Sequence, residues 1–412
     1  MNVLSVFNKP VFESNSEKRL YNYTFYSLVL GLIYPVVNDG SAFTNFVSLA
    51  CTGFAILAIF TYFSSYSVHK SSFSLKLYMI AVLYMLVIGI LGGSLQVDKP
   101  TLMLTITQDI RYVSLFLLGG IFAQDERLMD MFHQLLQAVA VIAVIMALIS
   151  VILIVQGGTL IARGGEDSTS YHYWWAATTC FAYCGFNSFF SQENKKINLG
   201  VLILYFLVGM SFLKRSCFIN SVIVVILSFY LLSKQGKGKK IFSNLILLLF
   251  VAFIITIILP GASDKVFGLL FERFSDTASD MNGFDRLMEY ESYKYITTLS
   301  QQLKGFGIGN YIYYDRYGNN SEVSLLNALH LGYANIMYKG GIVYALFYIF
   351  TYLQIFLNWF RRKQNASRYL VCFGVSISAL ISLFYEGSWT YTILPFCISA
   401  PIFYAARIKG GK

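Results

Sequence analysis

The chain has 412 residues, of which 56% are hydrophobic and only 13% are charged, and its mean hydropathy is +0.60. Soluble domains carry about 25% charged residues, so this composition excludes an ordinary soluble fold and favours an integral membrane protein. The formal net charge of +10 is explained by basic residues in cytoplasmic loops, and we expect no nucleic-acid partner.

Apolar segments follow one another along almost the whole chain. Most reach the roughly 20 residues that a bilayer requires, and no linker rich in proline or serine divides them. We therefore predict an all-α integral membrane protein, a single polytopic domain over residues 1–412 with about twelve spans. The predicted spans are 21–37, 42–63, 75–93, 101–122, 135–156, 171–190, 197–213, 217–233, 241–259, 331–360, 369–385 and 391–406.

The charges of the connecting loops predict the orientation. With the N-terminus inside, the loops on the cytoplasmic side hold nineteen lysines and arginines, whereas the short loops on the other side hold four. Basic residues concentrate in cytoplasmic loops. Both termini are therefore predicted to be cytoplasmic, and the long polar insertion over residues 260–330, between the ninth and tenth spans, is predicted to face the periplasm.

The insertion contains a pattern typical of an amphipathic helix. Apolar or aromatic residues recur at 287, 290, 293 and 296, so we expect a helix over 286–296 that lies on the bundle. Gly305, Gly307 and Gly309 alternate in the run 305–310. This run has neither the preceding strand nor the following helix of a nucleotide-binding turn, and we interpret it as a loop that ends the amphipathic helix.

Four basic sites project toward the predicted outer face: Arg111, which is taken up below, Arg163, Arg215 and Arg286. Arg163 precedes two glycines, and Lys214 and Arg215 occupy a three-residue turn that favours an anion contact for Arg215, although Lys214 can also extend outward into water. Arg286 stands at the start of the amphipathic helix, where a guanidinium suits a phosphate. A surface salt bridge with Glu289 explains Arg286 equally well.

Two further candidates differ in their setting. His330 closes the insertion at the membrane mouth, where an imidazole can deprotonate a hydroxyl near neutral pH; a structural role is the alternative. Arg111 lies inside a predicted span. Ionisable residues within the membrane are functional candidates, but a buried structural pair of Arg111 with Asp109 or Glu386 is as plausible.

Together these elements resemble the O-antigen polymerase and O-antigen ligase superfamily of bacterial inner-membrane glycosyltransferases. The resemblance covers the topology and five short motifs: Arg163-Gly164-Gly165; Lys214-Arg215-Ser216; Arg286-Leu287; the glycine run 305–310; and the stretch from His330 through Tyr333 to Asn335 with Gly340-Gly341 after it. The chain departs from the family where Thr169-Ser170-Tyr171 replaces an Asn-Pro-Asn, and where Lys214 adds a charge.

The resemblance implies a GT-C-like membrane enzyme without a metal or other cofactor. The donor and acceptor would be oligosaccharides on undecaprenyl pyrophosphate, held among membrane lipids. Arg215 and Arg286, with Arg163 and Lys214, would bind the pyrophosphate, and His330 would be the general base. Arg111, Asn335 and Tyr333 are further candidate site residues. A chain-length regulator protein is an expected partner.

Two alternatives stay open at this stage. A ligase would transfer the glycan to the lipid A core, and the motifs do not separate it from a polymerase, which we favour because the departures suit the more divergent branch. A lipid-linked oligosaccharide flippase would explain Asp109 and Arg111. It would not need a long outer insertion that ends in a histidine, and it would usually show repeat symmetry.

Overall fold

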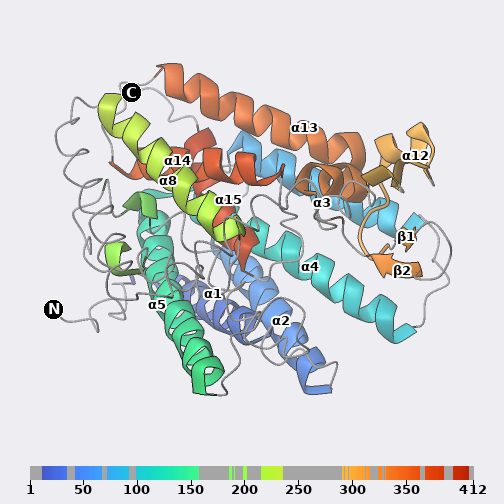
Figure 1. Ribbon diagram of the computed structural model, residues 1–412, viewed down its shortest axis with the longest axis horizontal. Helices are drawn as coiled ribbons and strands as arrows, with labels where there is room; N and C mark the ends of the chain where they lie inside the picture. Colours follow the sequence, from blue (N-terminus) through green and yellow to red (C-terminus); the bar gives the residue numbers. More distant parts are fainter. Residues whose placement is uncertain are drawn as a thin grey trace.

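The computed structural model is a bundle of long helices with a small hairpin at one end (Figure 1). It describes residues 12–34, 42–66, 72–91, 99–156, 185–187, 190, 198–201, 215–234, 290–291, 293–295, 297–310, 312–315, 323–326, 329, 331–361, 367–384 and 393–407. The helices are α1 (Asn15–Ile33), α2 (Ala42–Ser65), α3 (Phe73–Leu91), α4 (Lys99–Phe122), α5 (Glu126–Gln156), α8 (Arg215–Lys234), α12 (Leu299–Lys304), α13 (Gly332–Arg361), α14 (Ser367–Ser382) and α15 (Leu394–Ala406).

Each predicted span that the structure describes over most of its length coincides with a helix, although α1 begins at Asn15 against the predicted 21 and α5 at Glu126 against the predicted 135. Nine of the twelve predicted spans correspond to α1–α5, α8 and α13–α15. The predicted span 241–259 lies outside the described residues, as do most of 171–190 and 197–213. Within the described part of the chain, four helices are long and apolar enough to cross a membrane, namely α2, α3, residues 126–145 of α5, and α13. The total of twelve spans stays a prediction.

Large apolar side chains cover the outer faces of these helices. On α2 and α3, Phe46, Phe60, Leu83 and Ile90 are between 63% and 81% exposed. Such extensive exposed apolar surface is unusual in a soluble monomer. The bundle is therefore that of an α-helical membrane protein, with these faces suited to lipid.

The bundle interior is closed by aromatic side chains from four helices. The ring of Tyr78 in α3 lies 4.7 Å from that of Phe116 in α4 and 5.1 Å from that of Phe347 in α13, and Phe403 of α15 joins the group at 5.7 Å from Phe116. Gly119 lets α15 approach α4 closely, because a Cβ there would meet the Phe396 carbonyl oxygen at 2.8 Å. Close approach at small residues is a common way for membrane helices to pack.

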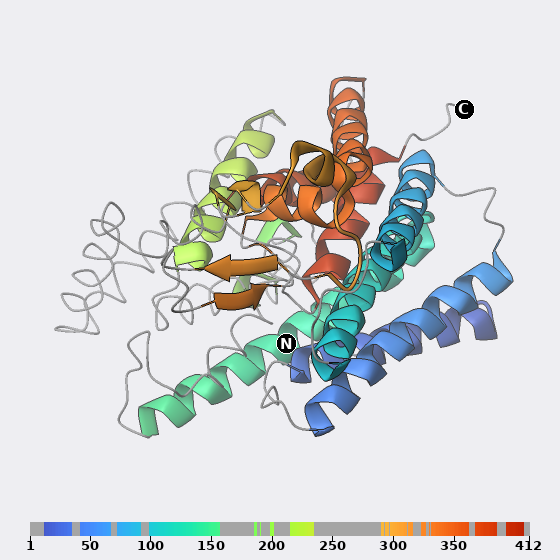
Figure 2. The ribbon, with the colours of Figure 1, turned by 90° about the vertical axis from the view of Figure 1, so that its right-hand side faces the viewer.

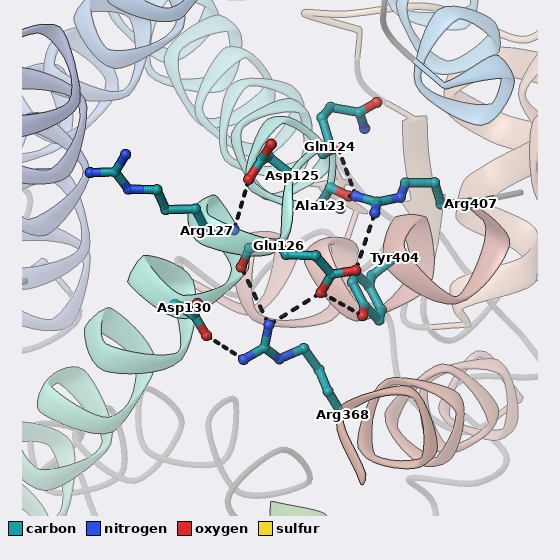
Figure 3. A network of polar contacts seen from close by, with 9 residues as sticks. All are labelled: Ala123, Gln124, Asp125, Glu126, Arg127, Asp130, Arg368, Tyr404 and Arg407. Atoms are coloured by element: carbon teal, nitrogen blue, oxygen red, sulfur yellow. Dashed lines mark hydrogen bonds and ion pairs between the residues drawn. The ribbon is translucent and has the colours of Figure 1, made fainter. Parts of the chain in front are cut away.

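A polar network joins helix ends at one end of the bundle (Figure 3). Glu126 at the start of α5 accepts from Arg368 of α14 (3.2 Å), from Arg407 after α15 (3.2 Å) and from the Tyr404 hydroxyl (2.8 Å). Arg407 also donates to the carbonyls of Ala123 and Gln124, the acceptors left open where α4 ends. Three basic residues from different predicted cytoplasmic loops, Arg127, Arg368 and Arg407, thus lie at the same end.

The described part of the insertion lies among α3, α4 and α13. Strands β1 (Ile312–Asp315) and β2 (Val323–Leu326) form an antiparallel hairpin in which Ile312 pairs with Leu326. Two views show the hairpin and α12 at the end of the bundle where α13 begins (Figures 1 and 2). The sequence analysis did not predict this hairpin, so the all-helical description holds for the bundle and not for the whole insertion.

Candidate functional site

Most of the charged residues of the predicted site lie outside the described residues, whereas the segments around them are described. His330, Arg286, Arg163 and Lys214 lie outside the described residues, and of Arg215 only the backbone is described, at the start of α8. The other three candidates, Arg111, Asn335 and Tyr333, are described with their side chains.

Asn335 clamps the main chain next to His330. Its Oδ1 accepts from the Leu329 N–H at 2.5 Å, and its Nδ2 donates to the Leu329 carbonyl oxygen. The Asn335 N–H in turn donates to the Leu331 carbonyl at 3.0 Å. Leu329, Leu331 and Asn335 are all buried. The residues on both sides of His330 are therefore fixed to the first turn of α13, and Asn335 satisfies buried backbone groups that would otherwise be costly.

A small aromatic core supports this clamp. Tyr293 and Tyr338 are fully buried with Leu329 and Leu331, and Phe306 packs against them. The Tyr293 ring lies 5.9 Å from that of Tyr338. Burial, with Tyr290 nearby, raises the pKa of Tyr293 to about 12, so its phenol is neutral at physiological pH.

The predicted amphipathic helix is confirmed where it is described. Residues 290–291 and 293–295 are helical. Tyr293 faces the core, whereas the side chains of Glu291 and Lys294 are 60% and 45% exposed and form a surface pair at 3.2 Å. The spacing of apolar residues in the sequence therefore corresponds to one packed face of the helix, and the charged residues between them lie on the solvated face.

The glycine run was interpreted too simply in the sequence analysis. Residues 305–310, which we call the glycine strap, follow a separate short helix, α12, and not the amphipathic helix. Helix α12 begins with a capping box between Thr298 and Gln301 and ends at the first residue of the strap. The strap then enters the bundle. Phe306 N–H donates to the Tyr338 carbonyl at 2.7 Å, Gly307 N–H to the Lys339 carbonyl at 2.8 Å, and Ile308 N–H to the Met85 carbonyl at 3.2 Å.

The strap requires glycine because its backbone adopts positive φ and touches other backbones. Gly307 has φ +76°, and a Cβ there would clash with the Gly89 N and lie 2.5 Å from the Met85 carbonyl oxygen. Side chains avoid this conformation, and neighbouring main chain cannot turn aside as a side chain can. Alternation of glycine is therefore a packing requirement here.

The strap fills a break in α13. Gly341 has φ 53° and ψ −146°, and these angles interrupt the helix. The short segment before the break, residues 332–340, is called the first half of α13, and the longer segment after it is the remainder. The carbonyls of Tyr338 and Lys339 just before the break accept from the strap. Within a membrane, backbone groups released by a broken helix need partners inside the protein. The N–H groups of the strap and the carbonyls before the helix break are thus hydrogen-bond partners for each other.

A buried ion pair fixes the same region. Lys339 Nζ lies 2.8 Å from Asp109 Oδ2, and both side chains are fully buried. The Gly309 N–H donates to the same carboxylate oxygen at 2.8 Å. One carboxylate of α4 therefore holds both the first half of α13 and the strap.

Arg111 follows Asp109 by two residues but makes different contacts. Its Nη1 donates to the Ser48 hydroxyl at 3.0 Å, and its guanidinium lies 4.4 Å from the centre of the Tyr34 ring. Arg111 is 5% exposed. Stacking on a tyrosine stabilises a guanidinium, so α4 carries two buried charges with separate environments.

Tyr333 contributes to an exposed aromatic group beside the clamp. Its ring lies 5.7 Å from that of Tyr290 and 6.1 Å from that of Phe384, and Lys294 Nζ lies 4.6 Å above the Tyr290 ring. Tyr333 and Phe384 are 36% and 68% exposed. Such a surface can hold the apolar face of a sugar or the edge of the lipid headgroup region.

Sequence reasoning missed Lys339, although a signal was present. Lys339 is an ionisable residue inside the predicted span 331–360, and such residues merit the same attention that Arg111 received. Asp109 was considered together with Arg111, as its partner or as part of a transport pathway, and not with Lys339. Its pairing with a residue 230 positions away needs the tertiary structure.

The fold and site together define a helical membrane protein with a discontinuous helix and a glycine segment packed into the helix bundle. Comparison of the chain with protein-family models, curated proteins and solved structures finds no match.

Proposed function

We propose that the protein is a polysaccharide polymerase of the bacterial inner membrane, which joins undecaprenyl-pyrophosphate-linked repeat units at the periplasmic face. The observation that carries the proposal is the clamp at Asn335, which fixes Leu329 and Leu331 on either side of His330. A general base needs to be held precisely against the hydroxyl that it deprotonates. The strap and the broken helix connect this clamp to a bundle of apolar helices, which supports a substrate carried on a lipid.

In the proposed reaction, an acceptor sugar hydroxyl attacks the anomeric carbon of the donor. The hydroxyl proton passes to His330, a new glycosidic C–O bond forms, and the bond from the anomeric carbon to the phosphate oxygen breaks. Undecaprenyl pyrophosphate leaves with the bonding electrons. Arg215 and Arg286, assisted by Arg163 and Lys214, offset the growing negative charge of the leaving group, and inversion at the anomeric carbon follows from the direct displacement.

The cellular test is deletion of the gene. Loss of a polymerase leaves lipopolysaccharide capped with a single repeat unit. Loss of a ligase leaves bare core while polymer accumulates on the lipid carrier, and loss of a flippase leaves bare core with single repeat units on the cytoplasmic side. Only the first result agrees with our proposal.

The residue-level test uses His330→Ala, Arg215→Ala and Arg286→Ala in the complemented deletion strain. Each is expected to abolish long chains without lowering the amount of protein in the membrane. His69→Ala, in a predicted cytoplasmic loop, is the matched control and should give a normal chain-length ladder. A normal ladder from His330→Ala would remove the general base from the mechanism.

One observation favours the flippase as a second candidate. Asp109 and Lys339 form an ion pair with no exposed surface inside the bundle, and intramembrane carboxylates occur in ion-coupled transporters. A flippase would move intact lipid-linked units across vesicle membranes without forming glycosidic bonds. Transport that requires Asp109 but is indifferent to His330→Ala would favour this candidate over the polymerase.

A further inference from the structure

The Asp109 carboxylate is the point at which three separate parts of the chain meet. Oδ2 contacts Lys339 Nζ and the Gly309 N–H, each at 2.8 Å. Gly309 belongs to the strap, Lys339 to the first half of α13, and Asp109 to the middle of α4, ten residues after the helix begins. At 1.5 Å per residue, Asp109 lies about 15 Å along α4 from its start.

Stability alone does not account for such a pair. Removing two charges from water is costly, and replacing a buried ion pair with apolar residues of similar size is often neutral or stabilising. What an ion pair adds is a defined geometry, because a carboxylate with two donors accepts only a narrow range of arrangements. Here the defined geometry is that of the strap against α13.

The first half of α13 connects this pair to the clamp. Asn335 precedes Lys339 by four residues, so the two side chains project from the same face of the helix one turn apart. The Tyr338 hydroxyl donates to the Asn310 carbonyl at 2.8 Å and adds a second tie between the half-helix and the strap. Because Gly341 interrupts the helix, the half-helix is oriented by these contacts and not by the rigid remainder of α13.

We propose that Asp109 and Lys339 are positioning residues: their ion pair holds the strap and the first half of α13 in one arrangement, and through Asn335 it sets the main chain on either side of His330. The catalytic consequence rests on the proposed function. The structural part, that the pair keeps the strap in the bundle, can be measured without it.

The decisive variant removes both charges while keeping apolar bulk. Asp109→Leu combined with Lys339→Met removes both charges of the pair together, and it takes the acceptor from the Gly309 N–H, which is the strap contact under test. The protein is expected to reach the membrane in normal amounts and to unfold within a few degrees of the parent. Asp109→Asn combined with Lys339→Met also leaves neither charge of the pair, but it retains a hydrogen-bond acceptor for Gly309 and serves as a partial substitution. The control is Glu291→Gln with Lys294→Met, which removes an exposed pair of the same type.

Strap position is read by cysteine cross-linking. The Ile308 N–H donates to the Met85 carbonyl, so Met85→Cys with Ile308→Cys, in full-length protein whose six native cysteines are replaced by alanine, reports whether the strap lies against α3. We expect efficient oxidative cross-linking in the parent and in the control. In the Asp109→Leu, Lys339→Met background we expect the yield to fall at least threefold, with the Asp109→Asn, Lys339→Met variant intermediate.

Transfer is measured in membrane vesicles supplied with lipid-linked repeat units. Misplacement of the clamp is expected to lower kcat at least tenfold while KM changes less than threefold, because the residues altered do not touch the substrate. Parental cross-linking and parental kcat in the double variant would each overturn the positioning role. If the parent catalyses no transfer but the variant still loses its cross-link, the proposed function fails and the structural role stands.

Discussion

Gly307→Ala gives the sharpest prediction about the strap. An alanine at φ +76° costs about 1–2 kcal/mol relative to glycine. Its Cβ would also overlap the main chain of α3 at Gly89 and Met85, so the strap has to move away. That movement breaks the hydrogen bonds from Phe306 and Gly307 to the α13 carbonyls, each with a net contribution of about 1 kcal/mol.

These contributions sum to roughly 3–4 kcal/mol against the docked strap. Since each 1.4 kcal/mol is a factor of ten, amide hydrogens in residues 305–310 should exchange roughly 10²- to 10³-fold faster in Gly307→Ala. Hydrogen exchange followed by mass spectrometry in lipid nanodiscs measures this segment directly. The global unfolding temperature should change less, because local opening does not require the bundle to unfold.

Gly53→Ala is the matched control. Gly53 lies in α2, and nothing is within 4 Å of the position that its Cβ would take. Alanine there should leave strap exchange unchanged and stabilise the helix by up to about 1 kcal/mol. If Gly307→Ala exchanges within threefold of the parent while Gly53→Ala behaves as stated, the close packing described for the strap is wrong.

The remaining predictions concern other contacts. Glu126→Ala removes the shared acceptor of the helix-end network and should lower the free energy of unfolding in detergent by about 2 kcal/mol. Glu291→Ala, at an exposed pair, is the control and should change the free energy of unfolding by less than about 0.5 kcal/mol. Equal unfolding temperatures for the two variants would contradict the network's role. Asn335→Ala leaves two buried backbone groups of Leu329 without their partner, so exchange at residues 329–331 should accelerate by at least about tenfold, and unchanged exchange there would show that the clamp is dispensable. Arg111→Lys keeps the charge but loses planar stacking and should cost about 1 kcal/mol in thermal unfolding; a more stable variant would show that the contact with Tyr34 is unfavourable.

The long helices were predictable because their signal is local. Each span needs only a continuous apolar run, and α2 begins at the predicted Ala42, while α4 ends at the predicted Phe122. The orientation of the chain in the membrane stays a prediction, but one consequence of the charge count is visible. Arg127, Arg368 and Arg407 come from loops assigned to one side by charge counting, and the structure brings them together.

The strap and its partners were less predictable because their signal is tertiary. Alternating glycines are compatible with an ordinary loop, and only the backbone of α3 explains why Gly307 cannot carry a side chain. The hairpin was missed because its strands have four residues each, which is too short for a periodic pattern to be convincing. Gly340-Gly341 was recognised as a family-like element, but a helix break is not visible in the largely apolar sequence of the predicted span 331–360.

The break in α13 and the insertion are therefore one structural solution to a single physical problem. A helix interrupted inside an apolar bundle leaves carbonyls that need partners within the protein. The strap supplies N–H groups for the carbonyls of Tyr338 and Lys339, and Asp109 accepts from both the strap and Lys339. Removing the strap would expose the break, and straightening α13 would leave the strap without acceptors. It follows that the insertion cannot be regarded as a cover over a complete bundle, because the bundle is incomplete without residues 305–310. A protein from which residues 305–310 are deleted should consequently lose the orientation of the first half of α13 even though every predicted span is retained.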